Sequence, residues 1–554
     1  MILEYLVCFV LALSFSSSVS YINTGECTFV TLEYCAKVII YFLIFILLFK
    51  VVRILLKRMT GVSEKIRLAA FERKYSVFII ATIIFLLWLP TFILLFPGTV
   101  INDTWGQLGQ YMEYTGTGNY AKGILYDHHP IFDTFFMGII ITGIKNFTGQ
   151  WNLALFGYVL IQAIFSAIAF AYTIEYTYNK LKLDARIGIV MILIYSLLPI
   201  FPMSVQTISK DALFSWTYVI FSVMFIEIVR TKADCLLSKR FMLAFIFICI
   251  LNCLTKKVGV YIVLISIGVA TFIKLKKIFR LYLIIPIFAI ITVMYVLMPI
   301  VIEATGTIKG GQQEMLSIPF QQTARYVKYH GDDITDYEYE VIDKVLWITD
   351  LSERYDPINA DPVKGYTPKG KAKDYSKYIK VWISQGLRHP KTYIEAFAAM
   401  ESGWFSWTEY SPIVSMDWHN QLNAKLIPEK IATRPDISEY TTNSYQNIID
   451  ELYQIPFIKL FFTYGLYASI IPGFIFATVF RKFRNKDIKY WIATVPMFLS
   501  IALGCWLAPV SIAAEGKRYL YPVIYTIPLM LAWCIYIYKR ENTSIKKVED
   551  KING

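Results

Sequence analysis

The sequence predicts an all-α polytopic membrane protein with about 12 transmembrane helices and a mainly helical extracytoplasmic domain. Of the 554 residues 56% are hydrophobic and only 17% are charged, and the mean hydropathy is +0.50. Soluble globular domains carry more charge than this. The net charge of +13 does not indicate nucleic acid as a partner, because the basic residues form short clusters between apolar runs.

Twelve apolar runs have the composition of membrane spans. They lie near residues 3–19, 37–56, 76–96, 152–174, 187–206, 211–229, 240–254, 258–273, 281–300, 457–479, 491–509 and 519–538. Basic clusters alternate with these runs, and Lys and Arg concentrate in cytoplasmic loops. We therefore expect a multi-pass protein of the cell membrane with both termini in the cytoplasm. This topology requires residues 129–145 to form a helix along the outer surface, because a span there would move several basic loops outside.

The spans divide the chain into five segments. These are an N-terminal two-span extension (1–75), a transmembrane core (76–300) with an outer loop and surface helix (97–150), an extracytoplasmic domain (301–456), C-terminal spans (457–538) and a cytoplasmic tail (539–554). The first run resembles a signal-peptide core. We interpret it as a retained span, because no basic residue precedes it and Glu4 stands in the place of one. Cys27 and Cys35 share the first outer loop, either as a disulfide or as two thiols.

A polar patch follows the third run and extends from Asp103 to the cluster at 127–130. Charged groups at a membrane edge are costly unless they serve chemistry, transport or a partner. Asp103 is a candidate general base for an acceptor hydroxyl, or a ligand of a divalent cation. The alternative is a helix N-cap ahead of residues 104–107.

The cluster Asp127-His128-His129-Pro130 supplies further candidate side chains. Adjacent histidines lack the i,i+4 spacing of helical zinc pairs. We expect one imidazole to hydrogen-bond the substrate and the other to orient a neighbour. The alternative is a structural turn onto the surface helix, which Pro130 would begin.

Three basic sites lie at the outer ends of spans, where short loops normally lack positive charge. They are Lys210-Asp211, Lys256-Lys257 and Lys517-Arg518. Lys and Arg at helix ends also extend to lipid headgroups, which is the simpler explanation. Three such sites on the side of the acidic patch favour a cationic pocket for a phosphate or pyrophosphate headgroup.

These motifs, in this order, resemble those of a known superfamily. They are Asp103, a loop closing with His129-Pro130, Lys210-Asp211, Leu254-Thr255-Lys256 and the stretch Glu515-Gly516-Lys517-Arg518-Tyr519-Leu520-Tyr521-Pro522. Together they resemble the GT-C polytopic glycosyltransferases, which include protein O-mannosyltransferases and the aminoarabinose transferases of lipid A. The resemblance covers about residues 76–300 and 457–538. Residues 314–325 also resemble an uncharacterised family of Gram-positive membrane proteins.

The resemblance implies an inverting transfer of a sugar from a polyprenyl-phosphate donor on the outer face. Asp103 matches the catalytic Asp of the family, and Lys256 and Arg518, with Lys210 as a weaker match, match donor-phosphate positions. The sequence departs from the family in two places. Asn102-Asp103 supplies one acid where many members have two, and Asp127-His128-His129-Pro130 replaces the commoner His-Pro-Pro. A metal role is therefore not carried over.

The predicted site combines these assignments. The catalytic candidates are Asp103, Asp127 and His129, and the donor-phosphate candidates are Lys210, Lys256, Lys257 and Arg518. The acceptor candidates are His128, Gln321, Gln322, Arg325 and Tyr519, of which the two glutamines and Arg325 would share one helical face of the outer domain. No cofactor is assigned, and a divalent cation stays open. The expected partners are a lipid-linked sugar donor, a cell-envelope glycan or lipid acceptor and membrane lipids.

Other functions share parts of this pattern. A transporter or flippase of lipid-linked precursors would place charges in mid-span and often repeat its two halves. A non-catalytic scaffold or sensor would leave Asp103 and the outer cations unexplained. A surface-polysaccharide polymerase or ligase would use the same chemistry on a lipid-pyrophosphate glycan, and the residues do not distinguish it.

Overall fold

The structure is a computed structural model that describes residues 2–27, 29, 31–60, 69–116, 123–273, 277–365, 370–406, 436–483, 488–507 and 516–553. These residues are mostly helical, with two short strand pairings. Eight of the helices are long and apolar enough to cross a membrane, or nine if a bent pair forms one span. The chain is therefore an all-α polytopic membrane protein, as predicted.

The span candidates begin with α1 (Ile2–Thr24), α2 (Leu32–Arg58), α4 (Ser76–Leu94), α6 (Ile131–Thr148), α7 (Trp151–Asn179) and α10 (Lys210–Thr231). The seventh candidate is the run Ile278–Ala304, which comprises α13 (Lys277–Thr292), η2 (Val293–Leu297) and α14 (Met298–Ala304). The eighth is Lys517–Asn542, most of which belongs to α25 (Tyr521–Asn553). The bent pair comprises Pro456–Phe462 and Leu466–Arg481 at 66°.

The predicted count of twelve spans is not established by these helices. Four of the predicted runs form helices of 13 to 17 residues, which are α8 (Ala185–Leu197), α11 (Lys239–Thr255), α12 (Lys257–Ala270) and α24 (Val495–Leu507). In contrast, α6 was expected on the surface and has the length and composition of a span.

The helices of the bundle pack around α10 and α25, whose apolar stretches are almost wholly buried. One continuous apolar core joins them to α4, α7, α8 and α11. In contrast, α2 leaves most of its apolar surface exposed, as a lipid-facing helix does. Helix starts are set by polar caps such as Ser209, whose Oγ accepts the Ala212 amide at 3.2 Å and fixes the start of α10.

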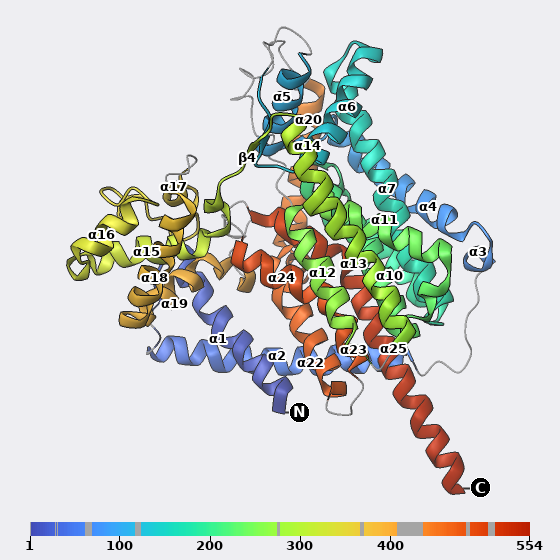
Figure 1. Cartoon of the computed structure of the whole chain (residues 1–554). Coiled ribbons are helices and arrows are strands. Elements are labelled where there is room, and N and C mark those ends of the chain that lie inside the picture. The colour runs from blue at the N-terminus through green and yellow to red at the C-terminus, as the bar shows by residue number, and fades with distance from the viewer. Residues whose placement is uncertain are drawn as a thin grey trace.

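Beside the bundle lies a separate lobe (Figure 1). It contains α15 (Ser317–Tyr329), η4 (Gly331–Asp333), α16 (Asp336–Asp343), α17 (Asp361–Lys364), α18 (Ala372–Arg388) and α19 (Pro390–Met400). These helices have an apolar core of their own. We call this unit the outer lobe. The segment α20 (Asp436–Gln454) is not part of this core and hydrogen-bonds the end of α4 through Thr441 and Thr442.

The N-terminal extension supports the outer lobe. Arg325 donates to the Gly25 carbonyl at 3.0 Å, and Tyr329 donates to Glu26 at 2.5 Å. Cys27 and Cys35 are free thiols. The loop between α1 and α2 is thus held by the lobe, so the extension and the lobe form one packed unit.

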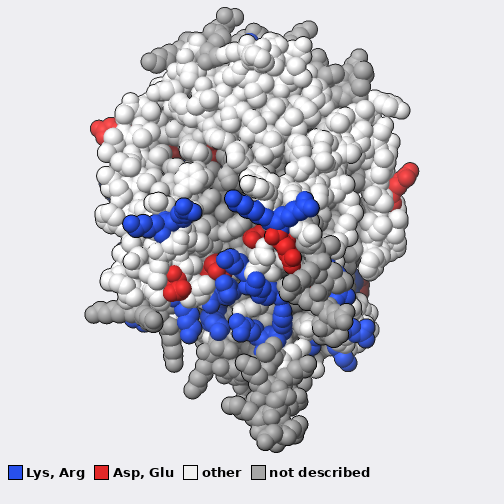
Figure 2. Space-filling model, turned by 90° about the vertical axis from the view of Figure 1, so that its right-hand side faces the viewer, with Lys and Arg blue, Asp and Glu red and all other residues white. Residues whose placement is uncertain are grey.

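Charge is distributed unevenly over the bundle. Figure 2 shows Lys and Arg side chains gathered on the lower half of one face, with few charged side chains above them. The start of α1 and the end of α25 also lie at the lower end of the molecule (Figure 1). The topology predicted from the sequence would place this basic end in the cytoplasm, and that assignment stays a prediction.

Candidate functional site

Two short strands bring distant parts of the core together. β1 (Thr99–Val100) pairs in parallel with β3 (Thr207–Ile208). Helix α5 (Asn102–Thr115) begins just after β1, and α10 begins just after β3. Because parallel strands leave their pairing at the same end, the first turns of α5 and α10 lie side by side. Asp103 and Lys210 occupy these first turns.

The strand pairing depends on close backbone approach at Gly98. Its φ is +113°, and a Cβ at this position would lie 2.6 Å from Val159 Cγ2 and 3.2 Å from the Gln206 carbonyl. The side-chain amide of Gln206 makes two hydrogen bonds to Thr99, both at 2.7 Å. Its Oε1 accepts from the backbone N–H of Thr99, and its Nε2 donates to the Thr99 hydroxyl. A side chain at residue 98 would therefore displace the segment that positions Asp103.

Five charged side chains form a single network at this place. Lys210 Nζ lies 2.6 Å from Asp103 Oδ2, and Arg518 Nη2 lies 3.1 Å from the same oxygen. Arg518 Nε lies 3.3 Å from Asp211 Oδ2, and Lys256 Nζ lies 2.6 Å from Asp211 Oδ1. We call Asp103, Lys210, Asp211, Lys256 and Arg518 the charge network. It joins residues up to 415 positions apart in sequence (518 − 103).

Lys256 reaches the network from the tight turn between α11 and α12. A Cβ on Gly259 would lie 2.2 Å from the Asn252 carbonyl, so the turn requires glycine there. The ammonium of Lys256 also lies 5.3 Å from the ring centroid of Tyr519 and 5.5 Å from that of Phe214. These cation–π contacts hold the lysine at the network's edge.

Several helices begin around the network. Asp103 is in the first turn of α5, Lys210 and Asp211 in that of α10, and Lys256 directly precedes α12. Arg518 lies in η8 (Gly516–Leu520), directly before α25. Helix N-termini carry partial positive charge, which adds to that of the cations. A cation in the first turn of α10 is unfavourable for that helix, so the carboxylates around it are needed for stability.

Positive charge exceeds negative charge in the network. Three cations meet two carboxylates, which leaves a net charge of +1 (3 − 2). Burial disfavours ionisation of Asp103, but Lys210 and Arg518 outweigh it and hold the pKa of this carboxyl well below its usual value. Asp211 is fully buried, whereas Asp103, Lys210 and Arg518 keep partly exposed side chains. An anion from solvent can therefore reach Lys210 and Arg518.

His129 lies against the network and is buried. Its Nδ1 is 2.9 Å from Lys210 Nζ, and because an ammonium can only donate, Nδ1 accepts and the ring proton is on Nε2. Burial and the positive charge of Lys210 hold the pKa of His129 well below its usual value. This histidine therefore stays neutral and orients Lys210.

The alternative assignment of Asp103 as a helix cap is wrong. Helix α5 begins at Asn102 with Ile101 as its N-cap, and no side chain caps it. Asp103 is inside the first turn, and its carboxylate binds Lys210 and Arg518. The Asp103 carboxylate thus pairs with Lys210 and Arg518, which are distant in sequence, instead of accepting a backbone N–H of its own helix.

A second ion pair joins Asp127 and Lys257. Their side chains lie 3.2 Å apart, and Lys257 also donates to the Asp127 carbonyl. β2 (Tyr126–Asp127) pairs in parallel with β4 (Ile308–Lys309), so three segments of the chain meet at the ion pair. Among the described residues, no hydrogen bond or ion pair links the side chains of Asp127 and Lys257 to the charge network. Their predicted catalytic and phosphate roles remain predictions, as does that of the exposed His128.

The predicted acceptor contacts of Gln321, Gln322 and Arg325 are corrected by the structure. All three side chains are buried inside the outer lobe. The two glutamines bind the backbone oxygens of Asp356 and Tyr393, and Arg325 pairs with Glu395 at 2.9 Å. Their hydrogen bonds hold the lobe together, so an acceptor glycan has no access to them. Tyr519, in contrast, lies beside the charge network.

Two buried acids were not predicted as site residues. Asp211 binds Lys256 and Arg518, and the Lys-Asp dipeptide opening an apolar run was the signal for it. Asp133 lies in α6, four residues after His129; it is 2% exposed, and neither carboxylate oxygen has a hydrogen-bond partner among the described residues. An acid inside an apolar run is a functional signal. Asp133 was not recognised as such a signal, because its segment was predicted to be a surface helix, where an acid is common.

A divalent cation at this site stays a prediction. Among the described residues, the one group of three or more His, Cys, Asp or Glu side chains close enough to share an ion lies in the outer lobe. The donors of the charge network are mainly nitrogen cations, which bind phosphate oxygens rather than metals. Glu515 of the late motif falls outside the described residues.

The fold and the charge network define a polytopic membrane protein with a cationic site between helix N-termini. The chain belongs to DUF6020, a family of unknown function whose model matches residues 1–549. No curated protein and no solved structure matches the chain significantly.

Proposed function

We propose that this protein is a membrane glycosyltransferase that uses a polyprenyl-phosphate-linked sugar and modifies a cell-envelope glycan or lipid on the outer face. The observation that carries the proposal is the convergence of Asp103 with Lys210, Lys256 and Arg518 in one network of excess positive charge. A carboxylate and several phosphate-binding cations are the groups that such a transfer requires.

In the proposed reaction the acceptor hydroxyl attacks the anomeric carbon of the donor sugar. The bond between that carbon and the phosphate oxygen breaks, and the electron pair leaves with polyprenyl phosphate. Asp103 takes the hydroxyl proton, and Arg518, Lys210 and Lys256 stabilise the charge that develops on the leaving phosphate. Displacement from the opposite side inverts the anomeric configuration.

The charge network also suggests when Asp103 becomes basic. Lys210 and Arg518 make it a weak base, because they stabilise its ionised form. A donor phosphate would compete for these two cations and would add negative charge near Asp103. Both effects raise its proton affinity, so we infer that donor binding activates the base.

Membrane topology is part of the proposal. The network lies near the α5 ends of the core helices, and the lower end of the molecule carries the gathered Lys and Arg side chains. We place the lower end in the cytoplasm, with both termini, by the positive-inside rule, and this proposal keeps α6 along the outer surface. The network then lies at the outer surface, at the depth of a lipid-linked phosphate.

The experiment that tests the proposal uses purified full-length protein in detergent, a panel of polyprenyl-phosphate hexoses and pentoses, and an envelope glycan extract. Release of polyprenyl phosphate is measured. We expect one donor to be consumed, and Asp103→Asn to slow release by about 100- to 10,000-fold. Failure of the wild type with every donor, or an unchanged rate for Asp103→Asn, would overturn the proposal.

A matched control exists at Asp184, the N-cap residue of α8. Asp184 pairs with Arg186 at 2.9 Å, as an acid and a guanidinium outside the network. Asp184→Asn should leave the release rate unchanged, and a comparable loss would mean that the assay reports stability rather than catalysis. Release in detergent, with no sealed compartment, also separates transfer from transport.

A further inference from the structure

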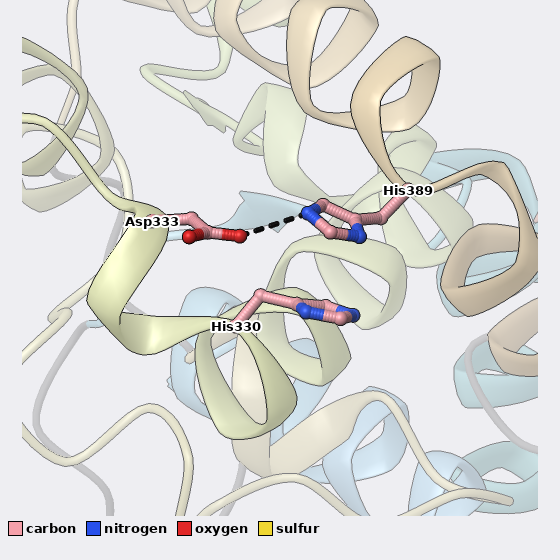
Figure 3. A group of neighbouring side chains, drawn as sticks. All are labelled: His330, Asp333 and His389. Atoms are coloured by element: carbon pink, nitrogen blue, oxygen red, sulfur yellow. Dashed lines mark hydrogen bonds and ion pairs between the residues drawn. The ribbon is translucent and has the colours of Figure 1, made fainter.

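Three potential metal ligands meet at one corner of the outer lobe. His330 follows the last residue of α15, Asp333 ends η4, and His389 lies between α18 and α19. One ligand atom from each lies within 4.8 Å of the other two. Figure 3 shows the His389 ring directed at the Asp333 carboxylate, with the His330 ring below it.

The hydrogen bonds around these side chains orient their nitrogens. His389 Nε2 lies 2.9 Å from Asp333 Oδ2, and His330 Nε2 lies 2.8 Å from Thr392 Oγ1. When Nε2 of His330 donates to Thr392, its Nδ1 carries a lone pair. Metal-binding histidines commonly donate their second ring N–H to a neighbouring oxygen in this way.

The surrounding lobe holds the three residues in place. Tyr326 packs on both imidazoles, with ring centroids 5.4 Å from His330 and 5.5 Å from His389. The neighbouring ion pair of Arg388 and Glu338, at 2.5 Å, joins the end of α18 to α16. The helices therefore meet through contacts that do not need His330, Asp333 or His389.

We propose that His330, Asp333 and His389 bind a divalent transition-metal ion of the zinc class. Two imidazole nitrogens and a carboxylate oxygen suit zinc, and three protein ligands leave one position for water. The side chains of Asp333 and His389 are 53% and 32% exposed, so an ion has access from solvent. This site is independent of the charge network and of the proposed glycosyl transfer.

Binding requires a local change of the two rings. They stack with centroids 3.7 Å apart and planes 19° apart, so their in-plane lone pairs lie in nearly parallel planes and do not converge on one point between the rings. To meet at one ion, the rings must turn toward each other. The metal would then replace the proton between His389 and Asp333 and link the end of α15 to the junction of α18 and α19.

The test uses the full-length protein without a polyhistidine tag, stripped with a chelator and titrated with Zn²⁺ against a chromogenic competitor. We expect one Zn²⁺ per chain and a metal-dependent rise in the unfolding temperature. In Asp333→Asn and in His389→Gln the affinity should fall by more than about 10-fold, since even supporting residues of a metal site contribute that much. Mg²⁺ should not compete.

The matched control is Asp332→Asn, which removes an exposed carboxylate next to Asp333. It should keep the affinity of the wild type. Co²⁺ provides a second readout, because its visible absorption reports nitrogen and oxygen ligation in protein that remains folded. Zinc binding of equal affinity in the wild type and Asp333→Asn, or no stoichiometric binding at all, would overturn the proposal.

Discussion

Arg518 and Arg325 are both held by carboxylates in regions that the sequence marked as functional, yet their surroundings differ. Arg325 pairs with Glu395 and donates to the Gly25 carbonyl, and its side chain is 3% exposed. Arg518 shares two carboxylates with Lys210 and Lys256, and its side chain is 24% exposed. The charge of Arg325 is neutralised by one carboxylate within the outer lobe, whereas Arg518 belongs to a network with excess positive charge.

This difference suggests how to separate structural from ligand-binding charges in a membrane protein. A buried cation with its own acid and backbone acceptors stabilises the packing around it. A set of cations that outnumbers its acids, and that stays partly exposed, has capacity left for an external anion. Four predictions test this distinction.

The largest expected effect concerns the buried ion pair of Arg325 and Glu395 in the outer lobe. Glu395→Gln leaves Arg325 buried without a carboxylate, and breaking a buried pair in this way typically costs about 3–5 kcal/mol. We expect a marked fall in denaturant resistance, measured by tryptophan fluorescence. Affinity for polyprenyl phosphate should be unchanged in protein that remains folded. A loss of that affinity would contradict the structural role of Arg325.

The next effect concerns the charge network. Arg518→Ala removes a charge-assisted contact worth about 1.5–3 kcal/mol, so affinity for farnesyl phosphate should fall by about 10- to 150-fold. Protection from thermal unfolding by this short polyprenyl phosphate measures the affinity. Arg186→Ala, which removes an arginine paired with Asp184, is the control. Equal protection in both variants would show that Arg518 does not bind phosphate.

A smaller effect is a pH dependence that depends on His129. Burial and Lys210 lower the pKa of this histidine in the folded state, while the unfolded chain binds a proton below about pH 6.5. Stability is therefore fully present above that pH and is lost as pH falls, by up to about 1.4 kcal/mol per unit. In His129→Asn, unfolding temperatures between pH 7.5 and 5 should fall less steeply. An identical slope would mean that His129 is not held neutral.

The smallest effect is expected at the exposed pair of Lys257 and Asp127. The side chain of Lys257 is 51% exposed, and such pairs contribute no more than about 1 kcal/mol. Lys257→Ala should therefore change the unfolding temperature only slightly and should lower phosphate affinity less than Arg518→Ala does. A loss as large as that of Arg518→Ala would place Lys257 inside the phosphate site.

Much of the charge network could be predicted from the sequence. Asp103, Lys210, Lys256 and Arg518 were recognisable because charges at the outer ends of apolar runs are rare. Their shared location followed from topology, since all four were assigned to the same surface. Asp211 was noted only as the residue after Lys210 in the Lys-Asp dipeptide. Its role as the acid between Lys256 and Arg518 depends on contacts among three segments of the chain.

The outer lobe was harder to predict. Gln321, Gln322 and Arg325 fall on α15 as expected, but α15 is enclosed on several sides, so its polar residues are buried rather than exposed. No local pattern reports how many neighbours surround a helix. For the same reason the outer loop motif did not reveal that Asp127 pairs with Lys257 apart from the charge network.

Hydropathy and the rarity of charge in apolar runs determined, from the sequence alone, that this chain is an all-α membrane protein with an unusual set of charges at the ends of its apolar runs. Both are local properties of composition. The tertiary structure decided which charges meet, through a two-residue strand pairing and the tight turn at Gly259. It also decided which polar residues are enclosed, because pairing and burial depend on side chains that are far apart in the sequence, such as Lys256 and Asp211 at a separation of 45 positions.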